Sequence, residues 1–81
     1  MRQVDIILKA MLMKDKKWIA SDFQHGDNFV GYEASARMSE LVNMYPSLFI
    51  ISKVGRFRAL EINKEEKELI KELSKKYEIN T

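Results

Sequence analysis

The sequence predicts one small domain of the α+β class, with helices before and after a single β-hairpin. Apolar residues recur with the period of amphipathic helices in three segments, 4–13, 32–44 and 69–77. Between the last two lies 48–62, a stretch rich in β-branched and aromatic residues with one glycine near its middle. A chain of 81 residues is long enough for one hydrophobic core, so we expect these elements to share it.

The first helix is expected over 4–13, because its apolar residues fall at i, i+3, i+4, i+7 and i+8 from Val4. The apolar run 18–20 is typical of a very short strand. Ser21 and Gln24 then have the spacing of a capping box, in which each side chain satisfies a free backbone N–H of the other residue. This spacing predicts a short second helix.

The third helix is expected over 32–44, because Pro46 disfavours a helical conformation in the residue before it. Its core stripe consists of Ala34, Met38, Leu41, Val42 and Tyr45. At about 100° per residue, the opposite side and its flanks carry mostly small and polar side chains. They are Tyr32, Glu33, Ser35, Ala36, Arg37, Ser39, Glu40 and Asn43.

The hairpin is expected to have strands 48–53 and 56–62, joined by a two-residue loop at 54–55. In this register Lys53 and Arg56 flank the turn, and Arg56 and Arg58 lie on one strand face by the period-two rule. Apolar residues occupy both faces of the first strand, so the pattern implies a second cover besides the helical core.

The last helix has a narrow apolar stripe on an otherwise charged surface. The stripe consists of Leu69, Ile70, Leu73 and Tyr77. We divide the chain into a domain over 1–62 and a C-terminal helix over 63–81, which serves packing or dimerisation. The stripe is covered either by the same chain or by a partner's helix, and we expect a homodimer through this helix.

Composition excludes several classes of protein. The net charge is only +2 and there is no cysteine, so neither a strongly basic chain nor thiolate chemistry is present. One histidine without cysteine predicts no metal site, and three scattered glycines predict no phosphate loop. No catalytic constellation, cofactor or small-molecule ligand is evident, so we expect a protein that is not an enzyme. Without a long apolar run or a secretory signal, no membrane partner and a cytoplasmic location are expected.

The order helix, short strand, helix, helix, hairpin resembles the winged helix-turn-helix superfamily of DNA-binding domains. The likeness covers roughly 4–62 and is carried by "WIASDFQ", "GYEASARMSELVNMYP" and "LFIISKVGRFRALEI". It implies a three-helix core with a short strand and a β-hairpin wing. In such proteins the third helix lies in the major groove of DNA, and the wing lies along the backbone or enters the minor groove.

Carried onto this chain, the resemblance implies a DNA-binding surface of small, polar and cationic residues. Its members are Ser21, Tyr32, Ser35, Ala36, Arg37, Ser39, Lys53, Arg56 and Arg58. Small side chains let a helix backbone approach a groove that is about 12 Å wide. Arginine and lysine neutralise phosphates, and the starts of the second and third helices offer free N–H groups to anions.

Each candidate also has an ordinary structural alternative. Arg37 is within helical reach of Glu33 and Glu40 and can form an ion pair with either. Tyr32 can pack on Phe29, and charges on a hairpin can serve solubility alone. The sequence therefore predicts a small, sequence-specific double-stranded DNA-binding protein that regulates transcription. The alternative is a winged-helix adaptor that binds another protein and no DNA.

Overall fold

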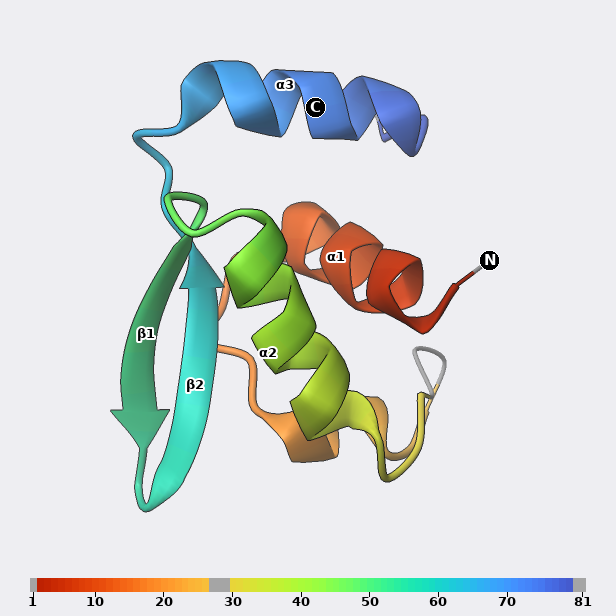
Figure 1. Ribbon diagram of the computed structural model, residues 1–81, viewed down its shortest axis with the longest axis vertical. Helices are drawn as coiled ribbons and strands as arrows, with labels where there is room; N and C mark the ends of the chain where they lie inside the picture. The colour runs from red at the N-terminus through yellow and green to blue at the C-terminus, as the bar shows by residue number, and fades with distance from the viewer. Residues whose placement is uncertain (1, 27–29, 80–81) are drawn as a thin grey trace.

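A computed structural model describes residues 2–26 and 30–79 of the chain. These residues form a small α+β domain of three α-helices, one turn of 3₁₀ helix and a two-stranded antiparallel hairpin (Figure 1). In chain order the elements are α1 (Gln3–Met13), η1 (Ala20–Phe23), α2 (Ala34–Met44), β1 (Phe49–Val54), β2 (Phe57–Ile62) and α3 (Lys67–Lys76). The arrangement is compatible with a winged-helix-like layout.

The core lies between α1, α2 and the hairpin. Both helices bury most of the apolar stripe that their spacing predicts, which confirms these two elements, while Leu12, Val42 and Tyr45 are only partly buried. The buried residues of the helices are Val4, Ile7, Leu8, Ala10, Met11, Ala34, Met38 and Leu41. Phe23, Leu48 and Leu60 fill the space between the helices and the hairpin and are fully buried. Each such large apolar side chain contributes about 1.5–3 kcal/mol by leaving water.

The expected second helix is only one 3₁₀ turn, and the predicted capping box is wrong. The capped residue is Ile19 and not Ser21. The backbone N–H of Ile19 donates a 2.9 Å hydrogen bond to Asp22 Oδ2. Ser21 contributes its carbonyl oxygen, which accepts from the N–H of Gln24 at 3.2 Å. The carboxylate of Asp22 thus reaches back three residues to the N-cap residue Ile19 and holds the turn closed.

The expected strand over 18–20 is reduced to one bridging residue. The N–H of Trp18 donates to the Leu60 carbonyl at 2.7 Å, and the N–H of Leu60 donates back at 2.8 Å. The buried indole of Trp18 stacks on Phe23 with ring centroids 5.1 Å apart. This bridge attaches η1 to β2 and leaves β1 as the free edge of the sheet.

The hairpin register differs by one residue from the predicted one. Val54 pairs with Phe57, and the loop is Gly55–Arg56. Gly55 has φ +62° and Arg56 has a negative φ, the pattern of a type II′ turn, in which the first central residue is glycine. Arg56 therefore lies in the turn rather than beside it, and it shares no strand face with Arg58. Lys53 pairs with Arg58 instead, so these two side chains lie on one face.

Helix α3 lies across α1 in the same chain (Figure 1). Leu73 is buried in the core, and the rest of the predicted stripe is partly buried against it: Leu69, Ile70 and Tyr77. Lys64, just before α3, forms an ion pair with Asp15, just after α1. The stripe therefore has a cover without a second chain, although dimerisation through this helix stays a prediction.

Candidate nucleic-acid interface

The three cations of the hairpin are exposed, and they surround its turn. Arg56 occupies the turn itself. Lys53 and Arg58 are paired across the strands one position further from the turn than Val54 and Phe57. Among residues 2–26 and 30–79, no carboxylate lies within ion-pair distance of any of them. Like charges opposite one another destabilise a hairpin, so this cluster carries a cost in folding that an external anion would relieve.

Arg58 joins the hairpin to α2. Its Nη1 donates a 3.1 Å hydrogen bond to Ser39 Oγ, and its side chain lines a small hollow together with Ala20, Ser35 and Met38. The hollow lies where η1, α2 and β2 meet. The predicted residues Ser35, Ser39 and Arg58 therefore come together, with Lys53 opposite Arg58 on the same hairpin face.

The outward side of α2 is smooth next to this junction. Ser35 and Ala36 are exposed, and Ser39 is half-buried beside Arg58. Asn43 follows Ser39 by one turn and is also exposed; the helical spacing places it on this side, outside the predicted set of site residues. Short side chains here leave the helix backbone accessible to a groove, and asparagine can bond adenine edges in two places.

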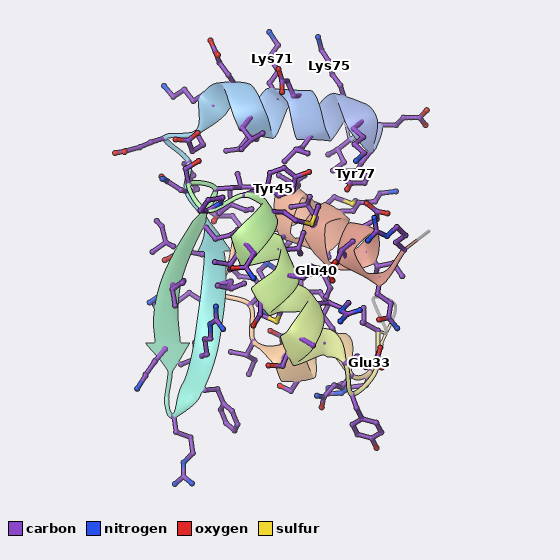
Figure 2. All side chains as sticks on the ribbon, viewed as in Figure 1. Glu33, Glu40, Tyr45, Lys71, Lys75 and Tyr77 are labelled. Atoms are coloured by element: carbon purple, nitrogen blue, oxygen red, sulfur yellow. The ribbon has the colours of Figure 1, made fainter. Side chains whose placement is uncertain are left out.

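Arg37 forms the ion pair with Glu40 that its helical spacing allows. Its Nε lies 3.3 Å from Glu40 Oε2, and Arg2 Nη2 lies 3.7 Å from the other oxygen of the same carboxylate. Glu40 lies on the side of α2 that faces α1, away from the Ser35–Ser39 side, and Figure 2 shows its position between the two helices. The Arg37 guanidinium is thus occupied by an internal partner rather than presented with the hairpin cations.

Tyr32 and Ser21 are not among the residues that line the hollow beside Arg58. Helix α2 begins at Ala34, two residues later than predicted, and Tyr32 is in the turn before it with 95% of its surface exposed. Its alternative partner Phe29 is outside the described residues. Ser21 is half-buried in η1, where the carboxylate of Asp22 already occupies the backbone N–H at the start of the turn.

Phe57 is a feature that the sequence analysis missed. Its side chain is 59% exposed at the tip of the hairpin, and its cross-strand partner Val54 is 42% exposed. Ile50 and Ile51 of β1 are also exposed, at 44% and 55%. Residues 2–26 and 30–79 therefore do not supply the second cover that the apolar hairpin implied. A correct turn register would have placed Phe57 next to the loop and so at the tip.

Other kinds of site find no support in the described part of the chain. Residues 2–26 and 30–79 contain no group of three or more His, Cys, Asp or Glu side chains placed to hold a metal ion. None of the described helices is long and apolar enough to cross a membrane. No family model, curated protein or solved structure matches the chain.

Proposed function

We propose that this chain is a small winged-helix protein that binds double-stranded DNA and regulates transcription. Helix α2 enters the major groove, and the basic hairpin is the wing, which lies on the backbone or in the minor groove. The observation that carries the proposal is the contact between Arg58 and Ser39, because it makes the hairpin cations and the small-residue side of α2 one continuous surface. The protein then acts as a binding module without cofactor or catalysis, and we expect it in the cytoplasm.

The charges set the expected strength of binding. Lys53, Arg56 and Arg58 neutralise about three phosphates, which gives a slope of about −2.7 in log K against log salt. Sequence preference then comes from the outward side of α2, where Asn43 and the serines can reach base edges. Selection of binding sites from random duplexes tests whether such a preference exists.

The binding test compares two double variants with the same loss of charge. One carries Arg56→Ala and Arg58→Ala, and the other carries Lys71→Ala and Lys75→Ala on α3. Figure 2 shows Lys71 and Lys75 on the side of α3 that points away from α1. Fluorescence anisotropy with a labelled duplex, repeated at several salt concentrations, should give the hairpin variant a slope smaller by about 1.8. The α3 variant should stay close to the unmodified chain.

A second candidate function follows from the exposed apolar side chains of the hairpin. Ile50, Val54 and Phe57 give one face of the hairpin an exposed apolar surface, and Ile51 is exposed on the other face. As an adaptor, the domain would bind a protein through this surface and no DNA. Absence of binding to any duplex in low salt at tens of micromolar protein would favour the adaptor, since non-specific binding has Kd of about 10⁻⁴–10⁻⁶ M even at physiological salt.

A further inference from the structure

The tip of the hairpin combines an exposed aromatic ring with positive charges that form no ion pair with the described residues. Phe57 is 59% exposed and directly follows Arg56 in the turn. Val54 lies opposite Phe57, so both apolar side chains are on one face. Lys53 and Arg58 are one position further from the turn and lie on the other face, because strand side chains alternate. The tip thus has an apolar side and a cationic side.

This combination matches the chemistry of the DNA minor groove. The groove has a floor of stacked bases between two walls of phosphate. A tip with an apolar side for the bases and a cationic side for a phosphate wall therefore matches it. A two-stranded ribbon has strands about 4.8 Å apart, and with its side chains it is too wide for a groove about 6 Å across. The ribbon can enter only if the groove is opened, and a kink toward the major groove opens it.

We propose that Phe57 is a wedge that inserts between two stacked base pairs from the minor groove and kinks the duplex. The inference rests on the proposed function and adds to it a distortion of the DNA. Lys53 and Arg58 on the other face of the hairpin, with Arg56 in the turn, contact phosphates next to the ring, and Val54 supports the ring from across the hairpin. Apolar side chains that enter base steps in this way unstack them and bend the duplex by about 20–90°.

The alternative role of the ring is local. Aromatic and β-branched residues paired across a hairpin stabilise it without any partner, and this role would be kept by any residue of high strand propensity. The wedge, in contrast, needs an apolar side chain of sufficient length. Threonine keeps the strand propensity and loses the wedge, while leucine keeps an apolar side chain long enough for the wedge without the β-branched or aromatic character that favours strands, so the pair Phe57→Thr and Phe57→Leu separates the two roles.

The experiment uses a duplex of about 25 base pairs, a length that a bound protein can bend measurably. The duplex carries 2-aminopurine at a TA step, which unstacks easily, and a fluorescent dye at each end. Binding of the unmodified chain should raise the 2-aminopurine emission and the energy transfer between the dyes. Phe57→Thr should abolish both signals with an affinity loss of about tenfold or less, because the lost contact is offset by the unstacking that is no longer required.

Two variants control for surface chemistry and for folding. Phe57→Leu should keep most of both signals. Ile51→Thr removes a side chain of similar exposure (55%) that lies away from the turn, and it should leave both signals unchanged. Thermal unfolding verifies that each variant is folded before it is titrated.

The results that overturn the inference differ from those that overturn the proposed function. Tight binding of DNA by the unmodified chain without a change in either signal contradicts the wedge alone. The same holds if Phe57→Thr gives the full signals. No binding to any duplex in low salt contradicts both. Binding to vesicles of anionic lipid that depends on Phe57, in a chain that does not bind DNA, would show a membrane contact and contradict both.

Discussion

Tyr77 Oη donates a 2.6 Å hydrogen bond to Asp5 Oδ1 and so ties the end of α3 to the first turn of α1. The two residues are 72 positions apart in the chain. Burial of the phenol, followed by its hydrogen bond to the Asp5 carboxylate, raises the pKa of Tyr77 above the ordinary value for tyrosine. Figure 2 shows Tyr77 directed from α3 toward α1. The contact is therefore a measurable indicator of whether α3 is in place.

Replacement of Tyr77 by phenylalanine should lower the free energy of unfolding by about 1 kcal/mol, the net value of an intramolecular hydrogen bond. It should also change the pH dependence. The folded state favours the neutral phenol, so its contribution is fully present below the ordinary tyrosine pKa of about 10 and is lost as the pH rises above it. Urea unfolding at neutral pH and above pH 10 measures both effects. Tyr32→Phe, which changes an exposed side chain, should alter neither.

Leu73→Ala should destabilise the domain by about 2–4 kcal/mol, because the leucine is buried where α3 meets the core. Leu69→Ala, in the partly buried portion of the same stripe, should cost clearly less. Thermal unfolding of the two variants makes the comparison. Equal, small effects would mean that α3 does not lie on α1 in solution.

The homodimer expected from the α3 stripe requires that two chains exchange this helix, since the apolar side is already occupied in one chain. An exchanged pair would keep the Tyr77–Asp5 and Leu73 contacts, but between chains. Sedimentation equilibrium over a wide range of protein concentration should then show twice the mass of one chain, and Leu73→Ala should weaken the association. A constant mass of one chain would contradict the dimer and leave the DNA-binding proposal as that of a monomer.

Glu40→Gln should strengthen DNA binding. The carboxylate of Glu40 holds both Arg37 and Arg2, and its neutralisation removes one negative charge beside α2 and releases Arg37. If Arg37 then contacts a phosphate, the salt slope steepens by about 0.9. Anisotropy titrations measure the change, and Glu72→Gln on exposed α3 is the control for net charge. Weaker binding by Glu40→Gln would show that the carboxylate contributes to the interface, as an acceptor for a cytosine amino group does.

Gly55→Ala should destabilise the hairpin by about 1–2 kcal/mol, since its φ of +62° is strained for a residue with a Cβ. Arg56→Ala in the same turn should alter stability by less than about 0.5 kcal/mol. The two variants should therefore separate folding from binding. Arg56→Ala loses DNA affinity at unchanged stability, and a stability loss as large as that of Gly55→Ala would assign the arginine a structural role.

The main elements could be predicted because their patterns depend on local periodicity. At helical spacing the apolar residues of α1 lie on one side of the helix, and so do those of α2. These are the sides that pack into the core. The hairpin was predicted one residue out of register, because the choice between Val54–Gly55 and Gly55–Arg56 depends on which position needs a positive φ. The preference of type II′ turns for glycine at the first central position selects the second loop, and β-branched Val54 then stays in the strand.

The local interactions of η1 and of Arg37 could not be predicted in the same way. Ser21 and Asp22 are both residue types that cap helix starts. In the structure the cap is Asp22, whose carboxylate accepts from the N–H of Ile19 and lies 3.3 Å from Lys16 Nζ. Arg37 has Glu33 and Glu40 within helical reach, and Glu40 also lies near Arg2 from another helix. In both cases a side chain distant from the local pattern takes part, and its position depends on the tertiary fold. The contact of Arg58 with Ser39 is of the same kind.

Trp18, the only tryptophan of the chain, precedes η1 and forms the bridge to Leu60 of β2, and Lys16 Nζ lies 4.7 Å from its ring. Its indole is 5% exposed, so unfolding transfers one fluorophore from an apolar environment to water. The emission of the unlabelled protein should therefore report the separation of the hairpin from the helices. With α3 followed separately through the part of the alkaline tyrosine absorbance that Tyr77→Phe removes, the two signals can distinguish release of the C-terminal helix from unfolding of the whole domain.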